Sequence, residues 1–369
     1  MCGIISILSK KNDVVGNLIA SLHRLEYRGY DSAGLSYIDD NSILQTVKTV
    51  GKLETLETLV AKRGSAGKIG IGHTRWATHG EVSIQNTHPH TSNGVSIVHN
   101  GIIENYRVLK NSLLEMDDVL FEGESDSEVI AKLIDSYLKV GFDFIDAFKK
   151  AVAQLIGTFA IVAICDQNAD TIIGAKRGAP MTIGLSQDKL SFYIASDAIA
   201  LSTLCDEISY LDEGDYVVCQ KKADQLSYNI LTETWEIVER KKVPNTVSLS
   251  DVGKNGFEDF MIKEISEEPI VIDKMISQFN CDFDIASYNS IYVIACGTSF
   301  YAGLLSKYWI EELVGLHVDV EIASEFRYRN LALSKDSLYI FISQSGETID
   351  TLSAMRKIKQ LGFDTLSIV

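Results

Sequence analysis

The sequence predicts two domains of different fold class: a layered α+β domain over residues 1–240 and an α/β domain with a doubly wound parallel sheet over residues 286–369. The length of 369 residues suits two or three domains. In the first 240 residues, strand-like and helix-like segments come in separate groups, which favours layered α+β over strict alternation. From residue 290 onward, fully apolar strands alternate with helices, which is typical of a parallel sheet covered on both faces.

Composition and charge exclude several protein classes. Hydrophobic residues make up 46% of the chain and charged residues 23%, which excludes disorder as the main state. The net charge of −16 argues against a nucleic-acid partner, because phosphate binding needs clustered Lys and Arg. The six cysteines form no C-x-x-C pair, so a disulfide framework or zinc cluster is not expected and a cytoplasmic location fits. The apolar run at residues 1–8 is too short for a signal peptide or a membrane span, so we expect no membrane partner.

The elements of the first domain follow from apolar spacing. A short apolar strand is expected at residues 4–8, and Leu18, Ile19, Leu22 and Leu25 have the spacing of a helix over 17–25. Further strands are expected at 95–99, 158–165, 171–174, 192–195 and 215–218, and amphipathic helices at 127–138 and 144–155.

Residues 241–285 are expected to form a linker and connecting helices. The polar segment 241–256, with Pro, Ser and Gly, predicts the linker, and the helix after it is expected to end before Pro269. In the second domain, the chain reaches Val369 inside a strand that no helix follows. We therefore expect an incomplete second domain and a chain that is part of something longer. The expected elements of this domain are strands at 291–295, 318–323, 338–342 and 365–369 and helices at 300–313 and 349–361.

Cys2 is the first candidate for chemistry. Removal of Met1 would leave a thiol whose own α-amine, with a pKa near 8, can act as general base. Such a thiol can attack an amide carbonyl and release ammonia. The alternative is an inert small residue, since any protein can begin with Met-Cys.

Later polar residues fit the same reaction. The Asn100 side-chain N–H and the Gly101 backbone N–H can form an oxyanion hole. Arg75 can hold a carboxylate with two hydrogen bonds, and Trp76 can cover a small ligand. Asp126 can bind an ammonium group, although a helix N-terminal acid is an equally good interpretation.

Five of the seven histidines lie within residues 73–99. No carboxylate or cysteine recurs among them at ligand spacing, so we expect hydrogen-bonded loop histidines and no metal. The residues concerned are His73, His79, His88, His90 and His99.

Two hydroxyl-rich segments of the second domain, CGTS at 296–299 and SQSGET at 343–348, are expected to be loops after apolar strands. Loops at the carboxyl ends of parallel strands bind ligands in α/β sheets, and helix N-termini with hydroxyl side chains suit a phosphate. Ordinary helix capping is the alternative for any one of these residues.

The motifs YRGYDSAG (27–34), HTRWATHGE (73–81), HPH (88–90) and VHNGIIENY (98–106) resemble the glutaminase domain of class II, N-terminal-nucleophile glutamine amidotransferases, a four-layer αββα fold. Within that group the chain resembles the glutamine–fructose-6-phosphate aminotransferases (isomerizing). The CGTS and SQSGET segments resemble the phosphate-binding loops of sugar isomerase (SIS) domains.

The resemblance implies roles for individual residues. Cys2 would be the nucleophile, with Asn100 and Gly101 as the oxyanion hole. Arg28 would have a positional role. Glutamine would be bound by Arg75, Trp76, Thr78, His79 and Asp126, with Trp76 also gating ammonia. Thr298 would contact the sugar, and the phosphate of fructose 6-phosphate would be held by Ser299, Ser343, Gln344, Ser345 and Thr348.

The implied activity is synthesis of glucosamine 6-phosphate and glutamate from fructose 6-phosphate and glutamine, in amino-sugar biosynthesis. The resemblance implies no cofactor and a homodimer formed through the SIS domain. The family's imine-forming Lys, ring-opening His and acid–base Glu have no counterparts in this sequence. A glutaminase without synthase activity and an inactive sugar-phosphate-binding fragment therefore remain alternatives.

Overall fold

The computed structural model describes residues 2–29, 31–63, 67–76, 80–116, 119–222, 225–247, 253, 255–278, 284–330, 332–346 and 348–369. The chain divides into two compact units, Met1–Ile265 and Ser266–Val369, and the division falls inside a helix, α6 (Phe260–Gln278). The predicted boundaries at residues 240 and 285 stay predictions. Among the described residues, no helix is long and apolar enough to cross a membrane.

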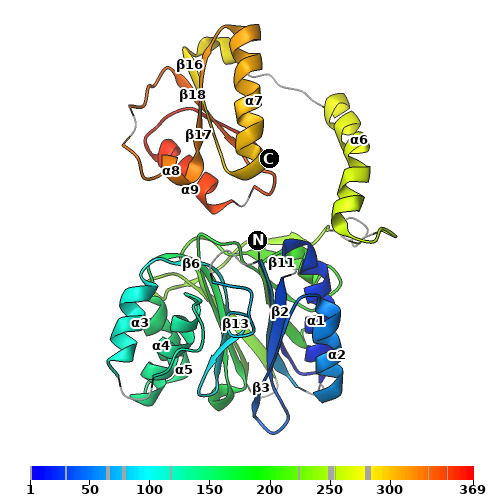
Figure 1. Cartoon of the computed structure of the whole chain (residues 1–369). Helices are drawn as coiled ribbons and strands as arrows, with labels where there is room; N and C mark the ends of the chain where they lie inside the picture. The colour runs from blue at the N-terminus through cyan, green and yellow to red at the C-terminus, as the bar shows by residue number, and fades with distance from the viewer. Residues whose placement is uncertain are drawn as a thin grey trace. The chain divides into compact units, whose positions relative to one another are not determined.

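Two antiparallel sheets form the centre of the first unit (Figure 1). In spatial order the first sheet contains β15 (Lys242–Pro244), β11 (Glu207–Tyr210), β9 (Thr182–Leu185), β10 (Ser191–Ala195), β1 (Gly3–Ser9), β4 (Ile69–Arg75), β2 (Ser32–Ile38) and β3 (Leu44–Val50). The second contains β14 (Ile237–Val238), β13 (Gln225–Leu231), β12 (Tyr216–Lys222), β8 (Thr171–Arg177), β7 (Gly157–Cys165), β6 (Val95–Ile103) and β5 (His90–Ser92).

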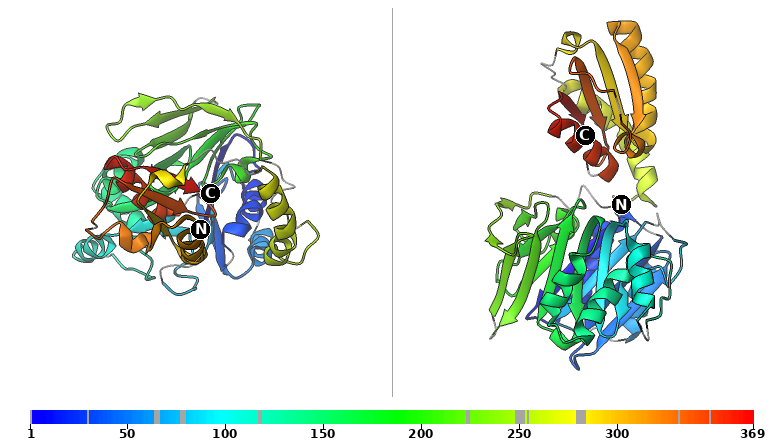
Figure 2. Two further views of the ribbon diagram at one scale, coloured as in Figure 1. Left: turned by 90° about the horizontal axis from the view of Figure 1, so that it is seen from above. Right: turned by 90° about the vertical axis from the view of Figure 1, so that its left-hand side faces the viewer.

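Helices cover the outer faces of both sheets. Helices α1 (Val14–Leu25) and α2 (Leu53–Arg63) pack on the first sheet, and α3 (Tyr106–Leu114), α4 (Glu128–Lys139) and α5 (Phe144–Val152) on the second. The right view of Figure 2 shows the last three in front of the strands. Short 3-10 turns lie at η1 (Glu26–Arg28), η2 (Asp166–Asn168) and η3 (Ala198–Leu201). The predicted αββα sandwich is therefore confirmed.

The alternation of β1 explains why this strand is central. Ile5 and Ile7 pack towards α1, whereas Ile4 and Leu8 pack between the two sheets. Because successive side chains of a strand point to opposite faces, an apolar strand must be covered on both sides. Cys2 directly precedes this strand, so a rigid element fixes its position.

Two details of the predicted connection were wrong. Residues 242–244 are strand β15, paired with β11, where a linker was expected, because Val243 packs against the core of the first sheet. Helix α6 continues through Pro269. Proline removes one backbone hydrogen bond and bends a helix, but it does not always end one.

The second unit has a parallel sheet with helices on both faces, which confirms the predicted α/β class. Its strands, in spatial order, are β17 (His317–Ile322), β16 (Ser290–Ala295), β18 (Ser337–Ile342) and β19 (Thr365–Ile368). One face packs against α8 (Ala323–Phe326) and α9 (Ile349–Gln360), and the other against Ile310 of α7 (Gly297–Val314). The turn η5 (Ile285–Ser287) precedes β16.

Candidate active site

The Cys2 thiol lies beside the backbone of Trp76, at the end of β4. The Trp76 N–H donates to Cys2 Sγ at 3.2 Å, and the Trp76 carbonyl lies 3.5 Å from the same sulfur. Burial raises the pKa of the Cys2 thiol, although the Trp76 N–H and the positive charge of the chain's amino terminus oppose this. The thiol is therefore protonated at neutral pH and needs a base before it can act as a nucleophile.

Asn100 joins the second sheet to the first at Cys2. Its Nδ2 donates to the Cys2 carbonyl at 2.8 Å, and its Oδ1 lies 2.9 Å from His73 Nε2. Gly101 follows with φ +131°, and a Cβ there would lie 2.0 Å from the Thr158 carbonyl oxygen. The structure therefore brings Asn100 to the nucleophile, and only glycine fits the next position.

Arg75 is buried at the end of β4 and binds the backbone at residues 80–81. Its Nη2 donates to the Gly80 carbonyl and its Nη1 to the Glu81 carbonyl, both at 3.3 Å. The Trp76 side chain is 46% exposed. Two predicted glutamine-binding residues, Thr78 and His79, lie outside the described residues.

Asp126 is buried beside the end of β6. Its Oδ2 accepts from the Ile103 N–H at 2.7 Å, and its Oδ1 accepts from the Ser127 hydroxyl at 3.3 Å. The carboxylate is thus bound to the backbone of Ile103, which lies two residues after the oxyanion-hole candidate Gly101.

Arg28 contacts the end of β10 next to β1. Its guanidinium forms an ion pair with Asp197, whose carboxylate also accepts from the Tyr27 hydroxyl at 2.7 Å. The adjacent Ser196 hydroxyl accepts from the Ile4 N–H at 2.9 Å. Sequence reasoning missed Asp197 and Ser196, because nothing in their local pattern relates them to a site almost 200 residues earlier.

A cluster of four buried histidines lies next to Asn100. His73 stacks on His88 with ring centroids 4.2 Å apart, and the His90 ring lies 4.6 Å from His88. His99 Nδ1 contacts the Ser127 hydroxyl at 2.8 Å. The prediction of loop histidines was wrong for His73, His90 and His99, which lie on β4, β5 and β6. Within the described ranges, no group of three or more His, Cys, Asp or Glu residues has a geometry that could hold a metal.

In the second unit, the two hydroxyl-rich segments lie side by side. Strands β16 and β18 are parallel neighbours, with Ala295 opposite Ile342, so both segments leave the same edge of the sheet. The buried Ser343 hydroxyl lies 3.2 Å from Thr348 Oγ1 and accepts from the Gly346 N–H at 3.1 Å.

The first of these segments is not a loop, which corrects the sequence prediction. Helix α7 begins at Gly297, so Thr298 and Ser299 lie in its first turn, where backbone N–H groups are free of helical partners. Gln344 and Ser345 are exposed in the loop between β18 and α9. All six predicted sugar-phosphate residues therefore lie at one edge of the sheet.

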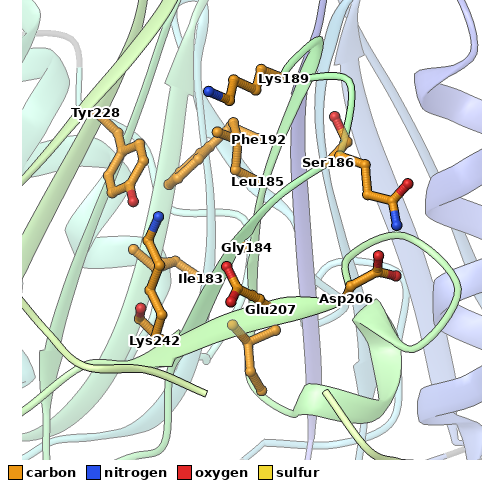
Figure 3. Close-up of a pocket in the computed structure, with 13 residues that line it drawn as sticks. Ile183, Gly184, Leu185, Ser186, Lys189, Phe192, Asp206, Glu207, Tyr228 and Lys242 are labelled. Carbon is orange, nitrogen blue, oxygen red and sulfur yellow. The ribbon is translucent and has the colours of Figure 1, made fainter. Parts of the chain in front are cut away.

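A pocket of about 430 Å³ lies at the opposite end of β1 from Cys2. Figure 3 shows Phe192 and Tyr228, whose rings stack 4.9 Å apart, with Lys189 and Lys242 nearby. Phe192 is paired with Leu8, near the far end of β1. At about 3.3 Å per residue, this pocket is about 20 Å from Cys2 and is separate from the candidate nucleophile.

Comparison with known proteins identifies related families for both units. Residues 73–203 match the family described as glutamine amidotransferase domain, and residues 284–369 match the SIS domain. A glutamine–fructose-6-phosphate aminotransferase (isomerizing) of Bradyrhizobium diazoefficiens is 42% identical, over 100% of this chain and 61% of the relative. The corresponding protein of Zymomonas mobilis is 41% identical, over 98% of this chain and 60% of the relative. The chain thus spans about three fifths of the length of these curated relatives.

Solved structures share the fold. A glutamine phosphoribosylpyrophosphate amidotransferase of B. subtilis aligns with a TM-score of 0.53 and 18% identity, over 92% of this chain and 75% of that one. A second structure, described as the allosteric regulatory enzyme of purine biosynthesis, aligns with a TM-score of 0.53 and 18% identity, over 99% of this chain and 80% of that one. At this identity the likeness concerns the fold alone.

Proposed function

This chain belongs to the family of isomerizing glutamine–fructose-6-phosphate aminotransferases, and on this premise we propose that its first unit releases ammonia from glutamine and its second unit binds fructose 6-phosphate. The observation that carries the proposal is the position of the Asn100 amide, 2.8 Å from the carbonyl of the candidate nucleophile Cys2. We further propose that the reaction takes place in the cytoplasm, in keeping with the free state of the described cysteines.

The proposed glutamine reaction starts with proton transfer. Removal of Met1 would free the α-amine of Cys2, which takes the thiol proton as sulfur attacks the side-chain amide carbon of glutamine. The tetrahedral oxyanion then accepts hydrogen bonds from Asn100 Nδ2 and the Gly101 N–H. The amine returns its proton to the leaving nitrogen, so ammonia departs and a thioester remains. Water hydrolyses the thioester to glutamate and restores the thiol.

We propose that glutamine is recognised by its α-carboxylate and α-amine. Arg75 would bind the carboxylate and Asp126 the ammonium, with Thr78 and His79 lining the pocket and Trp76 gating the released ammonia. The support is that Arg75 and Asp126 are both buried and held rigidly by backbone groups. A rigid charge binds a small zwitterion more tightly than a mobile one.

The proposed sugar site is the shared edge of β16 and β18. Ser343, Gln344, Ser345, Thr348 and Ser299 would hold the phosphate, because helix N-termini supply free N–H groups and hydroxyls add donors without bulk. Thr298 would contact the sugar. In the full conversion, ammonia condenses with the carbonyl group of fructose 6-phosphate with loss of water, and isomerisation then yields glucosamine 6-phosphate. No described residue of the second unit is assigned to these steps.

We also propose that the second unit forms homodimers through α7. Large apolar side chains recur on one stripe of this helix and are between 52% and 82% exposed. A helix with such a stripe is normally covered by another protein surface. The residues are Tyr301, Leu305, Tyr308, Trp309 and Leu313. A monomer by light scattering at micromolar concentration would refute this part of the proposal.

The deciding experiment measures glutamate release from glutamine by the purified chain, with and without fructose 6-phosphate. Release that rises with the sugar supports both sites and their coupling. Release that does not respond to the sugar would leave a glutaminase alone, and release of glucosamine 6-phosphate would extend the proposal to the full reaction. Absence of release from a chain with a free Cys2 amine would refute the glutaminase.

A further inference from the structure

We infer that His73 is a positioning residue that holds the side-chain amide of Asn100 with its N–H group towards the developing oxyanion. The inference rests on the proposed glutaminase and adds to it a residue that never touches glutamine. The motif HTRW places His73 two residues before Arg75, but only the structure relates it to Asn100.

The orientation of the Asn100 amide follows from its two contacts. The Cys2 carbonyl can only accept a hydrogen bond, so the amide atom 2.8 Å away must be the NH₂ group. The amide oxygen therefore faces His73 Nε2 at 2.9 Å. Because that oxygen can only accept, Nε2 of His73 must carry a proton.

The charge state of His73 agrees with this assignment. The side chain is fully buried, and burial lowers its pKa to about 3, so the ring is neutral at physiological pH and has one proton. The contact with Asn100 requires that proton on Nε2. A neutral ring also avoids placing a positive charge inside the sandwich near the buried guanidinium of Arg75.

His88 fixes the plane of the His73 ring. The two rings stack with centroids 4.2 Å apart and an angle of 30° between their planes. Both ring nitrogens of His88 are buried and without a hydrogen-bond partner among the described residues, so its contact with His73 is through the flat face. The stacking on His88 and the hydrogen bond from Nε2 to Asn100 together fix the orientation of the His73 ring.

The consequence for catalysis concerns the second hydrogen of Asn100 Nδ2. One hydrogen is bound to the Cys2 carbonyl, and the other is available to the oxyanion. Without the His73 donor, the amide can turn over and present its oxygen instead, which would repel the oxyanion. Since this interaction forms in the transition state, its loss should lower kcat and leave KM nearly unchanged.

The test compares His73→Leu, which lacks a donor, with His73→Gln, whose amide can donate from a similar position. For His73→Leu we expect kcat for glutamate release to fall about 10- to 100-fold with KM changed less than about threefold, and for His73→Gln most of kcat to return. In an Asn100→Ala background, adding His73→Leu should lower kcat by less than about twofold, because the two residues act as one unit. Equal losses in both backgrounds, or a loss confined to KM, would overturn the inference.

A measurement on the unmodified chain guards against variants that do not fold. Nitrogen-15 NMR of the histidine rings distinguishes a proton on Nε2 from one on Nδ1. A proton on Nε2 of His73 supports the amide orientation, and one on Nδ1 overturns it, whether or not the chain hydrolyses glutamine. An unmodified chain that releases no glutamate would instead overturn the proposed function and the catalytic part of this inference with it.

Discussion

Asn100 donates a hydrogen bond of 2.8 Å from its side-chain amide to the backbone carbonyl of Cys2. Asn100 lies on β6 of the second sheet and Cys2 directly before β1 of the first, so this bond connects the two sheets at the candidate nucleophile. The sandwich thereby fixes both partners of the proposed reaction before glutamine binds. Such preorganisation is the main source of electrostatic stabilisation in enzymes.

Replacing the nucleophile is the first prediction. We expect Cys2→Ala to lower glutamate release at least about a thousandfold, because no other group near Asn100 can form the thioester. The fold should persist, since alanine retains the small side chain before β1. The measurement is coupled glutamate detection together with the melting temperature. Cys296→Ala, in the second unit, is the control and should leave release unchanged. Turnover by Cys2→Ala would refute the assignment.

The second prediction concerns Arg75→Lys. The guanidinium reaches the carbonyls of Gly80 and Glu81 with separate nitrogens, and one ammonium cannot replace both contacts and also grip a carboxylate. We expect the KM for glutamine to rise about tenfold or more, with a smaller change in kcat. Steady-state kinetics tests this, with Arg107→Lys on the exposed face of α3 as a control that should behave like the unmodified chain. An unchanged KM would show that Arg75 is not the carboxylate anchor.

The fold and the candidate site differ in how much of each could be predicted from the sequence. Apolar periodicity was sufficient for the α+β and α/β classes and for most elements, since β1, α1 and the parallel strands of the second unit each carry a clear pattern. The four-layer sandwich was implied only by the family resemblance. Cys2, Arg75 and Asn100 were candidates because their chemistry is distinctive. Their mutual distances depend on the pairing of strands remote in sequence, which no local pattern encodes.

The errors have physical causes of the same kind. Proline ends many helices, but α6 continues past Pro269. Residues 242–244 lie in a segment that is polar as a whole, yet tertiary pairing with β11 makes them a strand. Histidine is intermediate between the buried and the exposed residue types, so its local sequence does not predict burial. Only the stacking of two sheets shows that His73, His88, His90 and His99 are buried together.

The third prediction concerns Gly101→Ala. A methyl group here would lie 2.0 Å from the Thr158 carbonyl oxygen, and φ is +131°, a conformation that alanine rarely adopts. We expect the free energy of unfolding to fall by about 2–4 kcal/mol from strain and overpacking. Urea unfolding tests this. Gly16→Ala is the matched control: α1 has open space at that position, so the change should stabilise by about 0.5–1 kcal/mol. Equal effects of the two changes would contradict the geometry.

The fourth prediction concerns pH. Burial lowers the pKa of His73 to about 3 and the pKa values of His88, His90 and His99 below their ordinary value as well. The unfolded chain therefore binds protons below about pH 6.5 that the folded chain does not bind, so stability falls as pH falls through this range. At pH 5.5 His73 alone should lower the free energy of unfolding by about 1 kcal/mol relative to pH 7.5.

Urea unfolding at pH 7.5, 6.5 and 5.5 measures this loss. In His90→Leu one of the proton acceptors is missing, so the difference between the unfolding free energies at pH 7.5 and 5.5 should be smaller than in the unmodified chain. Stability that stays constant down to pH 5.5 would show that the buried histidines titrate normally.

The last prediction concerns Ser345→Ala in the exposed loop between β18 and α9. If this hydroxyl donates to the phosphate of fructose 6-phosphate, its loss removes one hydrogen bond to a charged group and should weaken binding about tenfold. Isothermal titration calorimetry measures the change, and basal glutamate release should stay the same because Cys2 lies in the other unit. Ser306→Ala on α7 is the control, since that hydroxyl already donates to the Gly303 carbonyl at 2.8 Å. Equal affinity of Ser345→Ala and the unmodified chain would show that the Ser345 hydroxyl does not bind the phosphate.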